Sequence, residues 1–597
     1  MKKLYSLFLL VVFSLILLNL ASAVTVDKKH EITLLSVTEY SNGSMVGDLA
    51  YLDLQIRPGS GSVFLDSFPA TRIDTQVSAR MANEIACEKS HYGCSLYDFF
   101  YTIRAEASTI GGPSAGAAIT ILTLSALEDA PLKDKLAVTG AISSGGIIMP
   151  VDGIKEKVDA ADRNGYDLVI IPKLAISPEI NDTNSTNKTT DFFKPLVNSD
   201  FKDNKINIFE AITLEEAFQM ATKDKYVFDS VPKLKIPDEY FSRMKLTADK
   251  LCARSDELKS LTDDFNDSEL ERANEFLDYS VVAKDKNQHY SRASYCYSAN
   301  VELRSKLLSK YKQAILLDNL ENLNDSIVKF EEDVDAINLE TFSDLETYSI
   351  VKERLLESKR YLDTLNSSNI SSLELASSIE RYYSAVAWSA FFGMEGDVLD
   401  LNENAVKKAC SEELQSVHTR NNYLQTFMPN YLLQDLFLEI SEVNDYIRDE
   451  EYELCLFKAS KAKSYADYLI TGATLNNDTI IELTHQKQNV AKNLIANQQT
   501  RNLFPILGYS YYEYSQALED DSYYSALMFA ENSIALSDLS KYFETTQTQT
   551  TTSISNFGSR EKWFFVLGLF VGLILGFVLF GRNSKKTHKK HIKTTKH

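Results

Sequence analysis

Ser114 and Lys157 are the two residues of this 597-residue chain whose types and surroundings suit nucleophilic chemistry. Ser114 lies in the run GPSAG at 112–116, directly before a long apolar segment that begins with small residues. We expect a helix to begin there, which would put the serine where unpaired N–H groups and the helix dipole favour negative charge. A hydroxyl that attacks a carbonyl from this position would have its oxyanion stabilised.

The same run also fits G-x-S-x-G, the turn that carries the nucleophile in α/β-hydrolases. That mechanism requires an acidic residue and then a histidine later in the chain. Only His30 and His91 lie in the same part of the chain as the serine, and both precede it. The later histidines all lie in a helical region or beyond an apolar segment near the C-terminus: His289, His418, His485, His588, His591 and His597. A Ser-His-Asp hydrolase is therefore disfavoured.

A buried lysine can replace histidine as the base, because desolvation lowers the pKa of its ammonium group. The segment GIKEKVDAADRNG at 153–165 has helical spacing. Ile154, Val158 and Ala161 form its apolar stripe, and Lys157 borders that stripe at about 60° from Ile154. Because Lys155 points elsewhere, the spacing selects Lys157 as the desolvated base.

Short strand patterns surround both candidates. Apolar runs at 135–142, 146–151 and 167–172 are each bounded by Gly, Pro or Asp, which is typical of strands. Helix-like patterns are mixed with them between about residues 31 and 222. We therefore predict an α+β domain over 24–235 that positions the serine and the lysine.

Four blocks of this region, GGPSAG, AVTGAI, MPVDGIKEK and DLVIIPK, resemble the proteolytic domain of Lon peptidases in order, content and spacing. The resemblance extends less sharply from about residue 33 to 221 and covers roughly a third of the chain. It implies a fold like that of ribosomal protein S5 domain 2. It also implies that Ser114 and Lys157 form the Ser-Lys dyad of that family.

The activity that this resemblance implies is hydrolysis of peptide bonds. Lys157, in its neutral form, would take the proton of Ser114, which attacks the carbonyl and forms an acyl-enzyme that water releases. Thr139 matches the family's threonine before glycine and is expected to hydrogen-bond near the lysine amine. Backbone N–H groups around the serine would form the oxyanion hole, supported by Gly112, Ala115 and Gly116.

The chain departs from the Lon pattern in two ways. Lon enzymes commonly carry an acidic residue just before Gly-Pro-Ser, whereas this chain has Gly111 there, so polar support would come from elsewhere, with Asp74 or Gln76 as candidates. No G-x-x-x-x-G-K-[ST] phosphate loop occurs in the sequence, so we expect no use of ATP. We expect neither a cofactor nor a metal, because no His, Cys, Asp and Glu cluster has metal-ligand spacing.

From residue 236 to 543 glycine and proline become rare and apolar residues recur at helical spacing, which predicts an all-α domain of helical hairpins. Weak self-similarity at 382–390, 452–460 and 523–531 favours stacked hairpins, with an irregular bundle as the alternative. Three roles stay open for this region: gathering substrate, forming homo-oligomers, or acting as a spacer.

Both ends of the chain carry targeting signals. Residues 1–23 have a basic start, an apolar run and an ASA cleavage site, which predicts a secretory signal peptide, with an uncleaved anchor as the alternative. A Thr/Ser-rich stalk at 544–561, a transmembrane helix at 562–581 and a basic tail at 582–597 are expected near the C-terminus. Because basic flanks stay on the cytoplasmic side, the remainder would lie outside the cell membrane as a single-pass ectodomain. This combination is similar to predicted cell-surface peptidases of archaea.

The six cysteines, Cys87, Cys94, Cys252, Cys296, Cys410 and Cys455, all lie in the predicted ectodomain, where disulfides persist. Six cysteines permit 15 connectivities, so the sequence does not fix the pairing. Pairing in chain order is favoured, because each pair then falls within one local unit. Asn-x-Ser/Thr sequons make glycosylation an expectation, and their cluster at 181–189 indicates an exposed loop.

The net charge of −21 argues against nucleic acid as a partner, because phosphates require a basic surface. Two functions remain. The first is an ATP-independent serine endopeptidase that acts on unfolded or flexible polypeptides at the outer face of the membrane. The second is a non-catalytic surface scaffold or adhesin in which the helical domain binds a partner.

Overall fold

The computed structural model describes residues 29–544 except 41–42, 107–109, 174–175, 179–192, 196–200, 202–203, 365–369 and 474–478. The predicted signal peptide, transmembrane helix and basic tail lie outside the described residues, as do the sequon cluster and the predicted stalk beyond its first residue. Within the described ranges, no helix has the length and apolar content that a bilayer crossing requires.

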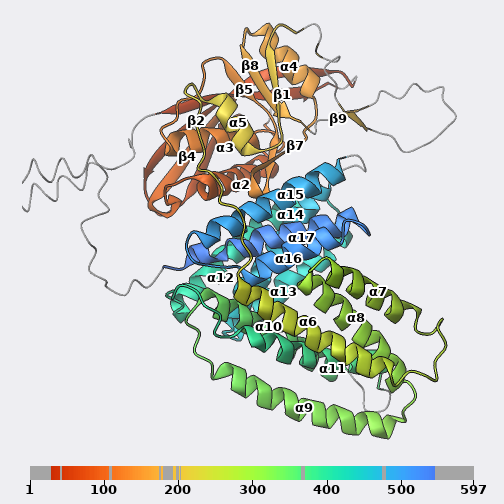
Figure 1. The fold of residues 1–597 in the computed structure, drawn as a ribbon. Helices are drawn as coiled ribbons and strands as arrows, with labels where there is room; N and C mark the ends of the chain where they lie inside the picture. The colour runs from red at the N-terminus through yellow and green to blue at the C-terminus, as the bar shows by residue number, and fades with distance from the viewer. Residues whose placement is uncertain are drawn as a thin grey trace, which may run out of the picture. The chain divides into compact units, whose positions relative to one another are not determined.

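A mixed seven-stranded sheet forms the first part of the molecule (Figure 1). Its strand order is β11-β8-β5-β1-β2-β4-β3. The pairs β1/β2 and β2/β4 are antiparallel, whereas β3/β4, β1/β5, β5/β8 and β8/β11 are parallel. The strands are β1 His30–Glu39, β2 Met45–Pro58, β3 Val63–Phe68, β4 Tyr97–Ala105, β5 Leu136–Val138, β8 Leu168–Pro172 and β11 Asn207–Ala211.

Two short antiparallel strand pairs, four helices and two 3-10 turns complete the described part of this α/β domain. The strand pairs are β6 with β7 and β9 with β10. The elements are α2 Ile73–Lys89, η2 Cys94–Leu96, α3 Gly116–Leu127, β6 Ala141–Ser143, η3 Ser144–Gly146, β7 Ile147–Met149, α4 Ile154–Arg163, β9 Ile176–Pro178, β10 Phe193–Pro195 and α5 Leu214–Ala221.

Apolar residues on the two faces of the sheet form two separate cores, because strand side chains alternate between faces. Helices α2, α3 and α5 cover one face, and every residue of α3 is buried. Helix α4 covers the other face, where Ile154 and Val158 pack with Leu35 of β1 and Val169 of β8. The sheet therefore holds α3, which follows the candidate nucleophile, and α4, which carries the candidate base, on opposite faces.

The strand expected over 135–142 is interrupted. It forms β5 up to Val138 and resumes as β6 at Ala141, with Thr139 and Gly140 between them. Gly140 has a φ of 149° and its N–H donates to the Ser114 carbonyl oxygen at 3.0 Å instead of continuing the ladder. The hydrogen bond at this break thus connects the end of β5 to the serine loop.

An all-helical region follows the α/β domain, as predicted, and both belong to one compact unit. Segment 223–237 between them carries neither helix nor strand. The helices are α6 Asp238–Lys259, α7 Glu271–Asp285, α8 His289–Leu308, α9 Gln313–Asp335, α10 Phe342–Thr364, α11 Ser372–Trp388, α12 Glu403–Leu424, α13 Gln434–Arg448, α14 Tyr452–Gly472, α15 Ile480–Gln499, α16 Ile506–Ala517 and α17 Tyr523–Ser537, with 3-10 turns η5 Ser389–Phe391, η6 Asn430–Leu432 and η7 Leu539–Tyr542. The three self-similar segments lie in α11, α14 and α17, which pack against α10, α12 and α16 respectively.

Three disulfides confirm the pairing in chain order. Cys87–Cys94 ties the end of α2 to η2. Cys252–Cys296 joins α6 to α8, and Cys410–Cys455 joins α12 to α14. Each bridge links neighbouring elements, so the physical reason for the prediction, locality within one unit, holds for all three.

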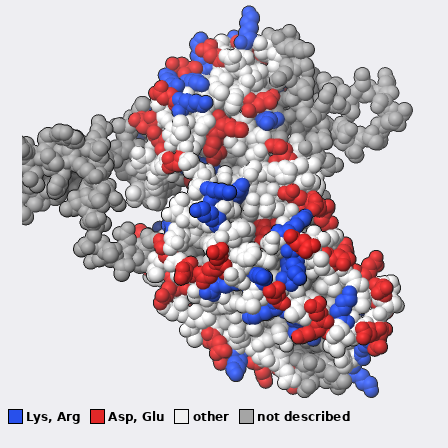
Figure 2. All heavy atoms as spheres, in the orientation of Figure 1, with Lys and Arg blue, Asp and Glu red and all other residues white. Residues whose placement is uncertain are grey.

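Charged side chains of both signs are interspersed over the described part of the face in Figure 2. No continuous basic area is seen on that part of the face. A surface of this kind offers no track for a phosphate backbone there.

Candidate active site

Ser114 lies two residues before the first residue of α3, as the sequence predicts. The N–H groups of Gly116 and Ala117 already donate to backbone carbonyls at 2.9 and 3.0 Å. The N–H groups of Ser114 and Ala115 have no acceptor among the described residues. These two groups remain available to an oxyanion at the positive end of the helix dipole.

Lys157 lies on the buried face of α4 and is 3% exposed, whereas Lys155 is exposed. This difference in burial follows the helical spacing of the sequence. Burial lowers the pKa of Lys157 to about 8, against the opposing effect of Asp152 and Glu156, whose charges raise it. A substantial fraction of Lys157 is therefore neutral near physiological pH, as a general base requires.

Thr139 lies on the same side of the sheet as α4. Ala137 of β5 belongs to the core under α4, and residues two apart on an extended chain share a face. The Thr139 side chain is fully buried, and its Oγ1 has no hydrogen-bond partner among the described residues. A buried hydroxyl without a partner is costly, so this group differs from most buried polar groups, which are hydrogen-bonded.

The side chains of Ser114 and Lys157 are also without hydrogen-bond partners in the described part of the chain. The backbone joins the serine loop to the end of β5, because Gly140, next to Thr139, donates to the Ser114 carbonyl. Catalytic hydrogen bonds are often long or absent in substrate-free sites and form when substrate binds. The structure brings the loops of Ser114 and Thr139 together and places Lys157 on the same side of the sheet as Thr139.

Helix α2 holds the loop before the serine. Thr75 Oγ1 donates to the Gly112 carbonyl at 3.2 Å, and Ser78 Oγ donates to the Pro113 carbonyl at 3.3 Å. Gly112 itself has a φ of 91°, a conformation that favours glycine. The sequence reasoning missed these two hydroxyls, although their spacing of three residues would have placed them on one helix face.

The two acidic or polar candidates near this loop differ in burial. Asp74 is buried at the start of α2, where its Oδ1 accepts the N–H of Thr75 at 2.7 Å. Gln76 is exposed. Of the two, only Asp74 therefore touches a residue that supports the Gly112 carbonyl.

Gly47 of β2 sets the height of α4 above the sheet, and the sequence reasoning missed it. A Cβ at this position would lie 1.9 Å from the Glu156 carbonyl oxygen and 3.0 Å from the backbone nitrogen of Lys157. Arg163 also donates from its guanidinium to the Gly47 carbonyl at 3.1 Å. Only glycine permits this close approach of strand and helix.

His91 is bonded to two carboxylates and not to Ser114. Its Nδ1 lies 3.0 Å from Glu128 and its Nε2 lies 3.1 Å from Asp229. Hydrogen bonds to these carboxylates raise the pKa of His91. A histidine paired at both ring nitrogens does not serve Ser114 as a base.

Comparison with known proteins shows a match to one family model in this part of the chain. Residues 75–190 match the Lon protease (S16) C-terminal proteolytic domain. The matched segment contains Ser114, Thr139 and Lys157. We refer to the sheet and its helices as the Lon-type domain.

Curated relatives match about a fifth of the chain. The chain is 37% identical over 130 residues to the Lon protease of Paraburkholderia phytofirmans and 39% identical over 138 residues to the archaeal Lon protease of Methanocaldococcus jannaschii. It is 34% identical over 134 residues to Lon protease 2 of Thermus thermophilus. These matches cover 21% of this chain and only 16 to 21% of the relatives. The chain thus matches only a small part of the length of these relatives.

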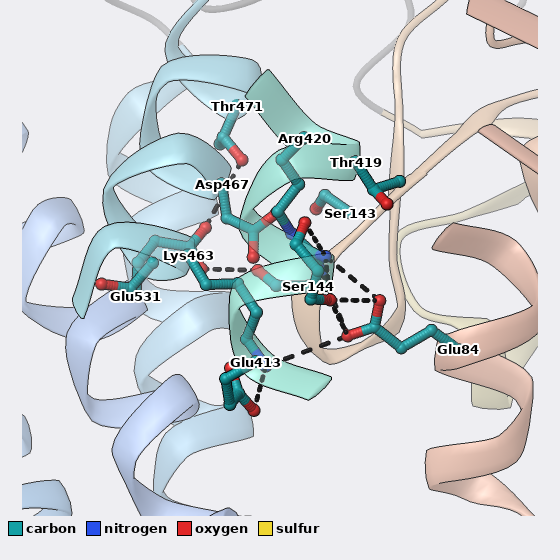
Figure 3. Close-up of polar contacts among 12 residues, drawn as sticks. Glu84, Ser143, Ser144, Glu413, Thr419, Arg420, Lys463, Asp467, Thr471 and Glu531 are labelled. Carbon is teal, nitrogen blue, oxygen red and sulfur yellow. Dashed lines mark hydrogen bonds and ion pairs between the residues drawn. The ribbon is translucent and has the colours of Figure 1, made fainter. Parts of the chain in front are cut away.

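A buried polar network joins the Lon-type domain to the helical region (Figure 3). Arg420 of α12 lies 3.1 Å from Glu84 of α2 and 2.7 Å from Asp467 of α14. Lys463 lies 2.9 Å from Glu413. Burial alone would raise the pKa of Glu84, but the nearby cations, Arg420 foremost, lower it to about 2. Every charge in this part of the network has a partner of opposite sign.

Lys487 of α15 completes the network at η3, next to β6. Its Nζ lies 2.7 Å from Glu531 and donates to the Ser144 carbonyl at 2.8 Å. Val490 fills the space beside Gly145, where a Cβ would approach it to 2.4 Å. The helical region therefore packs directly on the turn between β6 and β7 and does not act as a detached spacer.

Proposed function

We propose that this chain is an ATP-independent serine endopeptidase in which Ser114 is the nucleophile and Lys157 the general base. The observation that carries this proposal is a buried lysine whose pKa is lowered to about 8. The same domain has a serine at a helix N-terminus, and it matches the Lon proteolytic domain. Titratable groups perturbed in this way are typical of catalytic sites.

The chemistry would proceed in two steps. Neutral Lys157 accepts the proton of the Ser114 hydroxyl as Oγ bonds to the substrate carbonyl carbon, and the oxyanion is held by the N–H groups of Ser114 and Ala115. The lysine returns a proton to the leaving amine when the peptide bond breaks. Water then attacks the acyl-enzyme with Lys157 again as the base, which releases the acid and restores Ser114.

We infer that Thr139 Oγ1 orients the lysine amine during these steps. Its hydroxyl has no partner in the described chain and lies on the α4 side of the sheet. Neither a cofactor nor a metal enters the proposed chemistry. Among the described residues, no group of three or more His, Cys, Asp or Glu is placed to hold a metal ion.

The substrates we propose are unfolded or flexible polypeptides, because the sequence contains no phosphate-binding loop to power unfolding. The three disulfides favour a place outside the cytoplasm, where such bonds persist. Together with the signal and apolar segments of the sequence, they support our proposal of a membrane-anchored enzyme at the outer face of the cell.

The test is cleavage of a reduced, alkylated and therefore unfolded protein by the purified chain, followed by mass spectrometry of the products. We expect cleavage by the wild type at the same rate with and without ATP, and none by Ser114→Ala. Ser95→Ala removes an exposed serine of the same domain and should cleave normally. If the wild type and Ser114→Ala are equally inactive on several unfolded proteins, the scaffold function becomes the better conclusion.

A further inference from the structure

An apolar cavity of about 180 Å³ lies beside the nucleophile loop, between the Lon-type domain and the helical region. The Lon-type domain contributes residues from α2, the serine loop and the β6–β7 hairpin, and α12, α14 and the turns that follow them contribute the opposite wall. The wall from the helical region consists of Tyr423, Phe427, Ile470 and Ala473.

The cavity reaches the loop that carries the nucleophile, and neither Ser114 nor Lys157 is among its lining residues. Pro113, which precedes the nucleophile, lines it, and so does Ile142, two residues after Gly140. A Cβ on Gly116 would lie 3.0 Å from Ile142 and 3.1 Å from the Ser78 hydroxyl, which also lines the cavity. A polypeptide whose carbonyl is attacked by Ser114 would therefore have this cavity within reach of the neighbouring side chain.

The lining suits an apolar side chain of moderate size. None of the residues around the cavity is charged, and the Ser78 hydroxyl is already bonded to the Pro113 carbonyl. Burial and, to a smaller extent, Asp74 raise the pKa of Tyr423, so its hydroxyl stays neutral. An apolar cavity of about 150 Å³ accepts benzene, so this volume fits a leucine or phenylalanine side chain.

The wall from the helical region is held in place by packing. Tyr423 clusters with Val77 and Met81 of α2, and Ile470 packs against the same cluster. The rings of Tyr423 and Phe427 meet edge to face with centroids 5.0 Å apart. Phe427 is nevertheless 47% exposed, which leaves that side of the cavity open to an incoming chain.

We propose that the helical region supplies a wall of the substrate pocket, and that Tyr423, Phe427 and Ile470 select an apolar side chain on the residue whose carbonyl Ser114 attacks. This inference rests on the proposed peptidase function. It assigns to the helical region a role in specificity that does not require it to bind a partner of its own.

The test compares cleavage sites of the full chain and two wall variants on an unfolded protein, mapped by mass spectrometry. Ala473→Trp, at an exposed position on the wall, narrows the pocket and should lower kcat/KM after Leu and Phe by about tenfold or more relative to cleavage after Ala. Phe427→Ala widens it and should raise relative cleavage after Trp and Tyr.

Two control positions lie on α12 or directly after it, as Tyr423 and Phe427 do, but off the cavity. Asn422→Trp and Gln425→Ala are exposed and do not line it, so both should keep the wild-type preference. Labelling of Ser114 by a small serine-directed probe should be equal in all five proteins, which shows that the nucleophile is intact.

The outcomes separate the two proposals. If the wall variants cleave at the wild-type rate with an unchanged preference, the pocket assignment is wrong and the peptidase stands. If their preference changes no more than that of Asn422→Trp and Gln425→Ala, the wall assignment is equally wrong. If the wild type cleaves nothing and Ser114 is unlabelled, the peptidase itself fails and the pocket assignment fails with it.

Discussion

Lys157 and Lys487 are both almost completely buried, yet their surroundings are opposite. Lys487, at the interface of the two regions, has a carboxylate at 2.7 Å and further hydrogen bonds to the η3 turn. Lys157, on the buried face of α4, has no hydrogen-bond partner among the described residues, and its pKa is lowered to about 8. A buried cation with partners stabilises an arrangement of helices and strands, whereas one without them is destabilising and is expected where chemistry requires a neutral amine.

The largest effect should follow removal of the neutral base. Lys157→Arg keeps the positive charge but cannot lose it near neutral pH, so kcat/KM should fall by about 1,000-fold or more. Lys155→Arg, on the exposed side of the same helix, should leave kcat/KM within about twofold of the wild type. Peptidase assays on an unfolded substrate measure both. Activity that survives Lys157→Arg would contradict the dyad.

Removing Lys487 from its ion pair with Glu531 should affect the stability of the protein more than its catalytic activity. Lys487→Met leaves Glu531 buried without its cation, and the free energy of unfolding should fall by about 3–5 kcal/mol. Denaturant unfolding followed by circular dichroism measures this change. Adding Glu531→Leu should restore much of the loss, because no unpaired charge then remains. If Lys487→Met unfolds like the wild type, the network does not hold the two regions together.

The lowered pKa of Lys157 predicts that both activity and stability rise as the pH increases. The activity requires the neutral amine, so kcat/KM should rise towards a plateau above about pH 8. In the unfolded chain the pKa returns to its ordinary value near 10.5, so between these two pH values the unfolded state binds more protons.

Stability should therefore increase between about pH 8 and 10.5, by about 3 kcal/mol from this group alone. Lys157→Met should lose that increase, whereas Lys155→Met should keep it, and unfolding titrations at several pH values measure the difference. A pH–rate profile that is flat from pH 7 to 10 would contradict the lowered pKa.

The smallest effect should come from Thr139→Val. This change removes a hydroxyl with no partner, so the free energy of unfolding should not fall. Loss of one hydrogen bond to the lysine amine, worth roughly 1.5 kcal/mol, should lower kcat about tenfold.

Thr120→Val is the matched control, because Thr120 Oγ1 donates to the Gly116 carbonyl at 2.9 Å. Thr120→Val should lower the free energy of unfolding, and it should change kcat less than Thr139→Val does. Equal rates for Thr139→Val and the wild type would remove Thr139 from the mechanism.

Local patterns in the sequence predict much of the fold and the surroundings of the candidate residues. Helical spacing separates buried Lys157 from exposed Lys155, and the apolar run after Ser114 predicts the start of α3. Locality also predicts the disulfides. The first two features depend on residues on one helix face or next to each other in the chain, and each disulfide joins cysteines within one local unit.

Long-range packing explains what the sequence did not reveal. Arg420 and Glu84 are 336 positions apart, and no periodicity marks them as partners. In the sequence, Tyr423 and Phe427 have the pattern of ordinary helical core residues. Their position in the wall of the cavity follows from the packing of α12 against α2. The close approach of Gly47 to α4 likewise depends on the packing of β2 against a helix that follows it by about a hundred residues.

The most direct test of the account is covalent labelling of Ser114 by a serine-directed probe, located by mass spectrometry in the wild type and in Lys157→Ala. We expect labelling at Ser114 in the wild type, increasing as the pH rises through about 8, and none in Lys157→Ala. Equal labelling of the two folded proteins would show that Lys157 does not activate the serine, and absence of labelling in both would contradict a catalytic Ser114.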